Sequence, residues 1–173
     1  MTTRPLRTTF ADPRTGLEPM GRGECLMLLA QHQHQDGVGR LAVIEDDFPL
    51  IVPVNFAMIE DRIVFRSGAG TKLEAALRHA KVAFEIDHVN HEARTGWSVL
   101  VRGMAEVVTS THQLFALEHV ALQPFGKADK AHWVMIHPES ITGRRVPSFA
   151  SLLWVGDNDL GVGDDGAPAA PQG

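Results

Sequence analysis

The sequence predicts a mainly β fold, a six-stranded and mostly antiparallel barrel with a few covering helices. Three observations lead to this prediction. Segments that alternate apolar and polar residues outnumber helical segments, short hairpin turns join them, and strand–helix–strand alternation is weak. Closing such a sheet into a barrel also removes strand edges that would otherwise be open to pairing with other chains.

The first half of the chain predicts one helix and three strands. Residues 23–33 carry apolar side chains at helical spacing, with Cys25 as a buried small residue on that face. Strands follow, over residues 38–44, 50–58 and 62–66. Proline lacks an amide hydrogen, so we expect the second of these strands to have an edge or a bulge at Pro53.

The second half predicts two helices and three further strands. Ser110 and Gln113 form a capping box that would begin the second of these helices. The last strand should be broken near Pro138. In chain order the elements are a helix over residues 71–79, strands over 81–88 and 96–108, a helix over 110–122 and a strand over 131–145.

The length of 173 residues fits a single domain with a sizeable core. Residues 1–19 have little periodicity and read as an N-terminal arm, and residues 20–154 read as the folded domain. Residues 155–173 are rich in Gly, Asp, Ala and Pro, which is typical of a flexible tail.

Composition excludes several classes of function. The net charge of −5 and the scattered arginines argue against a nucleic-acid-binding protein. The sequence has neither an apolar run of the ~20 residues that span a bilayer nor a secretory signal, so we expect a cytoplasmic protein without membrane partners. Cys25 is the single cysteine, which excludes an internal disulfide and a zinc site of several thiolates.

Residues 66–74 carry the strongest functional signal. Thr71 and Glu74 form a capping box, so a helix should begin near Thr71, directly after a strand. The free N–H groups and the macrodipole of a helix N-terminus favour an anion. Four polar or basic residues would surround this end: Arg66, Ser67, Thr71 and Lys72. The same pattern fits an ordinary strand–turn–helix junction, and the local residues leave both interpretations open.

Two histidine pairs have a spacing that metal ligands can adopt. His32 and His34 fall at the end of the first helix and are interpreted as a solvated face, and His88 and His91 fall in a polar loop. No metal is therefore predicted. Trp97 lies on an apolar strand face, which fits core packing and contact with a cofactor equally well.

A set of short motifs occurs in a particular order along residues 20–145: Val38–Ala42, Pro53–Phe56, Ile63–Arg66, Gly70–Leu73, Val82–Glu85 and Gly96–Val99. Together they resemble the pyridoxamine 5′-phosphate oxidase-like, FMN-binding split-barrel family. The resemblance implies a Greek-key type split barrel. It also implies a homodimer with FMN sites at the subunit interface, each built from both chains.

The resemblance carries three groups of cofactor-binding residues onto this sequence. They are the phosphate ligands Arg66, Ser67, Thr71 and Lys72, the strand along the flavin ring with Pro53, Val54 and Asn55, and the pair Trp97 and Ser98, which approaches the ring from the next layer. Arg144 or Arg145 would reach the partner's flavin. No catalytic residue is assigned, since the flavin itself performs the redox step.

The chain departs from authentic pyridoxamine phosphate oxidases at its C-terminal end. Residues 157–173 are acidic where those enzymes carry a basic and aromatic segment that holds the substrate, and the chain has no tyrosine. We therefore expect an FMN-dependent oxidoreductase acting on a different, unidentified small molecule. The alternative is a non-catalytic protein that binds or senses flavin, a deazaflavin coenzyme or haem.

Overall fold

The computed structural model describes residues 11–35, 37–68, 77, 79–122 and 132–147. Most of the predicted helix over residues 71–79, residues 1–10 of the N-terminal arm and the tail lie outside these residues; Leu77 and His79 are described, and both are in turns. The described part contains β1 (Glu18–Met20), α1 (Arg22–Gln35), β2 (Val38–Glu45), β3 (Phe48–Ile59), β4 (Arg62–Ser67), β5 (Ala80–Asn90), β6 (Thr95–Val107), α3 (Thr111–Leu117) and β7 (His132–Val146).

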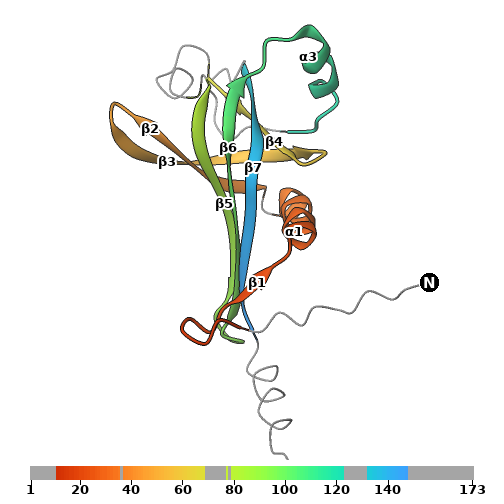
Figure 1. Ribbon diagram of the computed structural model, residues 1–173. Coiled ribbons are helices and arrows are strands. Elements are labelled where there is room, and N and C mark those ends of the chain that lie inside the picture. Colours follow the sequence, from red (N-terminus) through yellow and green to blue (C-terminus); the bar gives the residue numbers. More distant parts are fainter. Residues whose placement is uncertain (1–10, 36, 69–76, 78, 123–131, 148–173) are drawn as a thin grey trace, which may run out of the picture.

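The predicted six-stranded antiparallel barrel is present. The strands are ordered β7-β4-β3-β2-β5-β6, and β6 pairs back onto β7, which closes the ring. Figure 1 shows β5, β6 and β7 as long neighbouring strands, with the β2–β3 hairpin crossing them and projecting to one side. The helix α1 lies beside β7 in this view. Two predicted strands, β3 and β5, extend by one or two residues beyond both of their predicted ends, and β6 is shifted by one residue toward the N-terminus.

A seventh strand, β1, was not predicted. It pairs antiparallel with the last part of β7, from Glu18 opposite Arg145 to Met20 opposite Gly143. The prediction that residues 1–19 form an irregular arm is therefore wrong at its C-terminal end. Three residues have too little periodicity to be recognised, and their strand exists only because β7 extends beyond β4 and leaves an edge for them.

The barrel interior forms the main core, and α1 contributes to it. Cys25 and Leu29 of α1 are fully buried among inward-facing strand residues, as predicted for Cys25. Burial raises the pKa of the Cys25 thiol above its ordinary value. Phe56 and Phe84 meet edge to face at 4.9 Å between ring centroids, so β3 and β5 are packed together across the interior.

A second, smaller core lies on the outer face of β4 and β7. Its buried members are Val64, Val108, Leu117, Trp133 and Met135. The helix α3 supplies Leu117, and Val120 and Leu122 after the helix also pack against it. This explains why α3 ends at Leu117 and not at Leu122 as predicted: the following residues leave helical geometry and cover the sheet. Ser110 stands at the N-cap, but its side chain makes no capping bond.

Of the two predictions made for prolines, one is confirmed and the other is wrong. Pro53 pairs with Arg40 of β2, while the described pairing of β3 with β4 starts only at Phe56, so the edge position is confirmed. The predicted break at Pro138 is wrong, because β7 continues through a register shift opposite Arg102 and Gly103. A bulge absorbs the missing proline donor and keeps the ladder intact on both sides.

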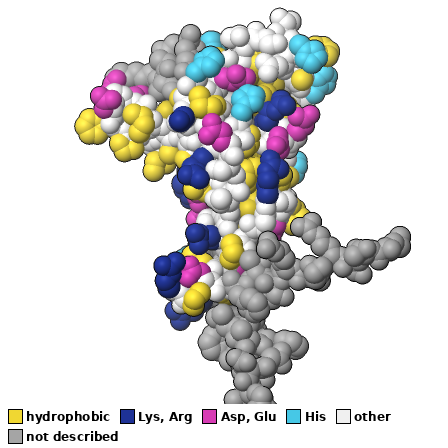
Figure 2. Space-filling model, viewed as in Figure 1, with side chains coloured by type: hydrophobic (Ala, Val, Ile, Leu, Met, Phe, Trp, Pro, Cys, Tyr) yellow, Lys and Arg dark blue, Asp and Glu magenta, His cyan; other side chains and the backbone are white. Residues whose placement is uncertain are grey.

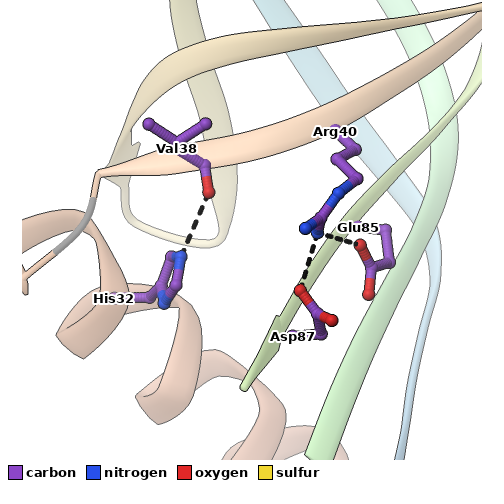
Figure 3. A network of polar contacts seen from close by, with 5 residues as sticks. All are labelled: His32, Val38, Arg40, Glu85 and Asp87. Carbon is purple, nitrogen blue, oxygen red and sulfur yellow. Dashed lines mark hydrogen bonds and ion pairs between the residues drawn. The ribbon is translucent and has the colours of Figure 1, made fainter. Parts of the chain in front are cut away.

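A charged cluster connects β2 and β5 on the outside of the barrel (Figure 3). Arg40 Nη1 donates to Glu85 Oε2 at 3.0 Å and to Asp87 Oδ1 at 2.7 Å. Burial, and then the nearby charge of Asp87, raise the pKa of Glu85 above its ordinary value of 4.5. The ionised Glu85 therefore costs stability at neutral pH, and this cost is lost as the pH falls through the raised pKa.

Replacing Glu85→Gln should accordingly raise the unfolding free energy at pH 7 by up to about 1 kcal/mol, because the neutral amide avoids the cost of the buried charge. The gain should shrink as the pH falls toward 4.5, where Glu85 itself becomes protonated. Thermal unfolding of both proteins across this pH range measures the difference. Glu92→Gln, in the exposed β5–β6 turn, is the matched control. A Glu85→Gln protein that is less stable than wild type at pH 7 would contradict the conclusion that the ionised Glu85 lowers the unfolding free energy.

Candidate functional site

The predicted residues Asn55 and Arg66 lie next to each other on the outside of the barrel. The described pairing of β3 with β4 ends at Phe56 opposite Phe65, and both side chains are buried in the interior. Because side chains alternate along a strand, the next residues, Asn55 and Arg66, both point outward. The β3–β4 hairpin thus brings these two residues together.

A cavity of about 720 Å³ adjoins this place. Its walls are the C-terminal end of α1, the outer face of β3 from Asn55 to Met58, and residues 120–122 after α3. Gln33 joins two of these walls, since its Oε1 accepts a hydrogen bond from the Met58 amide at 2.6 Å. Gln33 Nε2 also donates to the ring of His34 at 3.3 Å. The cavity therefore has a fixed polar wall on α1 and an apolar wall opposite.

The turn that leads from α1 into β2 also lines the cavity. Gly37 has a positive φ of 62°, a conformation that side-chain-bearing residues rarely adopt. Its carbonyl accepts a hydrogen bond from the amide of Phe56 at 3.1 Å. This bond holds the end of α1 against β3 directly beside Asn55.

Two buried hydrogen-bond donors near the end of β4 have no partner within the described residues. They are Arg66 Nε and Ser67 Oγ, and Ser67 is only 3% exposed. An unsatisfied buried polar group costs about 1–3 kcal/mol, so such a pair is expected where a ligand supplies the acceptor. A phosphate oxygen can accept from both a guanidinium and a hydroxyl. The residues present therefore fit a phosphorylated cofactor.

The remaining predicted phosphate ligands, Thr71 and Lys72, lie outside the described residues. Of the three residues predicted along the flavin ring, Pro53 is exposed on the same outer face as Asn55. Val54 is buried and belongs to the main core, so only its backbone is available to a ligand at this face. The site that one chain assembles is thus the outer strand surface at Pro53, Asn55 and Arg66, with the buried Ser67 at the end of β4 on the side that alternates inward.

Trp97 and Ser98 lie at a different end of the barrel. Arg66 pairs with Trp133 near the start of β7, whereas Trp97 pairs with Arg145 near its end. At about 3.3 Å per residue, the stretch of β7 between Trp133 and Arg145 is on the order of 40 Å long. The Trp97 ring packs against the main core, 6.1 Å from the His32 ring. In one chain, Trp97 and Ser98 are therefore separated from Arg66 along β7, although the His32 ring lies between the Trp97 ring and that of Phe56, the neighbour of Asn55.

The interpretation of His32 as solvated is wrong. Its side chain is 7% exposed, and Nε2 donates to the Val38 carbonyl at 3.1 Å (Figure 3). Its spacing from Cys25 and Leu29 places it on the buried face of α1, a signal that the sequence already contained. His34, by contrast, is exposed and lines the cavity. Within the described ranges no group of three or more metal-ligating side chains occurs, and no helix is long and apolar enough to cross a membrane.

The cavity residues Gln33, His34 and those at 120–122 were not predicted as site residues. Their sequence neighbourhoods carry no motif. They become neighbours of Asn55 only because α1 ends at β3 and because the chain after α3 folds back onto the sheet.

Comparison with known proteins gives consistent relatives. The chain is 32% identical over 143 residues to the uncharacterized protein Rv0080 of Mycobacterium tuberculosis, covering 79% of this chain and 91% of that protein. A solved structure described as the FAD binding protein from Mycobacterium smegmatis superposes with a TM-score of 0.62 at 33% identity, covering 73% of this chain and 96% of the other. An FAD-binding protein from Mesorhizobium loti gives 0.57 at 25% identity, covering 76% and 99%.

The family match covers most of the described domain. The family described as pyridoxamine 5′-phosphate oxidase matches residues 22–145, from the start of α1 to the end of β7. This range includes both strands that form the Arg66 site and the closed barrel that positions them. The chain belongs to the pyridoxamine 5′-phosphate oxidase-like family.

Proposed function

We propose that this protein is an FMN-binding oxidoreductase that acts on a small molecule. The observation that carries the proposal is the pair of buried donors without a partner within the described residues, Arg66 Nε and Ser67 Oγ, which lie just beyond the β3–β4 pairing. Asn55, opposite the end of that pairing, lines a cavity of about 720 Å³. The similarity to two FAD-binding proteins supports a flavin as the ligand. A cytoplasmic location stays a prediction.

Different residues of the chain would contact different parts of the cofactor. Arg66 and Ser67 would bind the phosphate ester, with Thr71 and Lys72 as predicted further ligands. Asn55 lines the cavity with an amide that can both donate and accept, which suits the polar edge of a flavin ring. Val120 and Leu122 would exclude water from the opposite side. A bound flavin supplies the hydride or electron transfer itself.

We also propose that the protein is a homodimer. Within one chain, Trp97 and Ser98 lie far from Arg66, so a second copy is needed if both groups contact one cofactor. The β2–β3 hairpin offers a surface for this contact, with Ile44, Phe48 and Ile51 all more than half exposed. Figure 2 shows these hydrophobic side chains gathered at the projecting end of that hairpin. An exposed apolar group of this kind typically marks an interface.

A second candidate is FAD in place of FMN. Two structural relatives, at 33% and 25% identity, are described as FAD-binding. Both cofactors present a phosphate next to the ribityl chain, so Arg66 and Ser67 fit either one. The remaining alternatives are a non-catalytic protein that binds flavin, and a site for a deazaflavin coenzyme or haem.

Absorption spectroscopy of the purified protein separates these candidates. Flavin bands support the proposal, and chromatography of the released cofactor then distinguishes FMN from FAD. Bleaching by NADH or NADPH, followed by reoxidation with a quinone, would identify an oxidoreductase. A Soret band would indicate that the bound cofactor is haem and not a flavin. A colourless protein that binds neither added FMN nor added FAD would contradict the proposal.

Arg66→Ala should weaken FMN binding by about 1.5–3 kcal/mol, the usual contribution of a hydrogen bond to a charged group. This corresponds to roughly 10- to 150-fold in Kd. Titration monitored by flavin fluorescence gives the value, and riboflavin, which lacks the phosphate, should bind equally well before and after the change. Arg62→Ala is a suitable control, because Arg62 lies on the same strand but pairs with Glu60. Unchanged FMN affinity in the Arg66→Ala protein would show that the phosphate binds elsewhere.

Phe48→Ser should shift the protein from dimer toward monomer, because it removes the most exposed aromatic side chain of the β2–β3 hairpin, 76% exposed. Sedimentation velocity at micromolar concentration measures the shift. Phe115→Ser is the matched control, since Phe115 on α3 is also an aromatic and is 65% exposed. A wild-type protein that sediments as a monomer, or a Phe48→Ser protein that remains dimeric, would exclude this hairpin as the interface.

A further inference from the structure

Arg66 is in contact with an aromatic residue that the site described so far does not use. Trp133 lies directly opposite Arg66 in the β4–β7 pair. The guanidinium carbon of Arg66 is 5.2 Å from the centroid of the Trp133 ring, within the range of a cation–π interaction. The two residues therefore form a cross-strand pair at the end of β4 where the unpartnered donors lie.

Trp133 is itself held firmly in place. It is 8% exposed and belongs to the outer core with Leu117 and Met135. Its carbonyl accepts a hydrogen bond from the Val108 amide at 2.8 Å. The ring is thus a rigid platform, fixed by α3 on one side and by the strand on the other, and it limits where the Arg66 guanidinium can lie.

Stacking on a ring has a particular chemical advantage for a binding arginine. The indole face attracts the cation without accepting any of its N–H groups, so the donors remain available. A carboxylate partner would hold the guanidinium equally well, but it would occupy the donors and neutralise the charge. In agreement, Arg66 Nε has no partner within the described residues although it is buried.

We propose that Trp133 is a positioning residue that holds the Arg66 guanidinium ready to donate to the phosphate of the cofactor, and that this pair sets the preference for phosphorylated flavins over riboflavin. The inference rests on the proposed function. It adds a role for a residue outside the predicted ligand set and names the chemical group that the pair recognises.

A packing role and a positioning role differ in one measurable respect. If Trp133 only fills the outer core, its replacement lowers the stability of the protein and weakens the binding of every flavin to a similar extent. If it acts through Arg66, the loss is confined to ligands that carry a phosphate. The loss also disappears once Arg66 is absent, because coupled residues are not additive.

The test is the Kd of FMN and of riboflavin, measured by flavin fluorescence, for wild type, Trp133→Leu, Trp133→Met, Trp133→Phe, Arg66→Ala and the Arg66→Ala/Trp133→Leu double variant. The two variants without an aromatic ring, Trp133→Leu and Trp133→Met, should bind FMN about tenfold more weakly, a loss within the range of a cation–π interaction. Their affinity for riboflavin should change by less than about twofold. Trp133→Phe should restore most of the FMN affinity. In the Arg66→Ala background, Trp133→Leu should add almost nothing.

Met135→Ala is the matched control, because Met135 is buried in the same outer core but pairs with Val64 and not with Arg66. It should lower the unfolding temperature and leave the FMN-to-riboflavin ratio unchanged. Trp133→Met provides the measurement if Trp133→Leu does not fold. A folded ringless variant that keeps the wild-type ratio overturns the inference and leaves the proposed function intact. A wild-type protein that binds neither flavin overturns both.

Discussion

Burying a hydrogen-bond donor without an acceptor costs free energy, and at the end of β4 the described part of the chain offers no acceptor to Arg66 Nε or Ser67 Oγ. Proteins tolerate such groups mainly where a ligand completes them. Arg66 lies over the Trp133 ring, which attracts its charge but accepts no hydrogen bond. The surrounding strands thus keep the two donors out of water without satisfying them, and an anionic group is the chemistry that they match.

The strand β7 determines where these groups lie. One edge pairs with β6 along most of its length, and the other pairs with β4 near its start and with β1 near its end. This double pairing fixes Trp133 opposite Arg66, and it fixes Arg145 opposite Trp97 at the far end. A bulge opposite Arg102 and Gly103 lets the strand pass Pro138 without losing the ladder. The barrel therefore holds its two candidate flavin-contact regions apart in a single chain.

Sequence patterns predicted the strands well and the site only in part. The alternation of apolar residues along β5 and β6 is a local property, so those strands could be predicted from the sequence. The end of α3 was not, because the helical spacing of Leu114, Leu117 and Ala121 continues past Leu117, while Val120 and Leu122 pack on the outer core. The meeting of Asn55 with Arg66 depends on the register of β3 with β4. That register is set within one hairpin, whereas the cavity walls from α1 and from residues 120–122 arise only when distant segments pack.

A crystal structure of the protein with FMN tests the central claim most directly. The structure predicts that phosphate oxygens lie within hydrogen-bond distance of Arg66 Nε and of Ser67 Oγ at the end of β4, with the ring system against the outer face of β3 at Asn55. A phosphate bound at another part of the barrel, with these two atoms still lacking an acceptor, would contradict it.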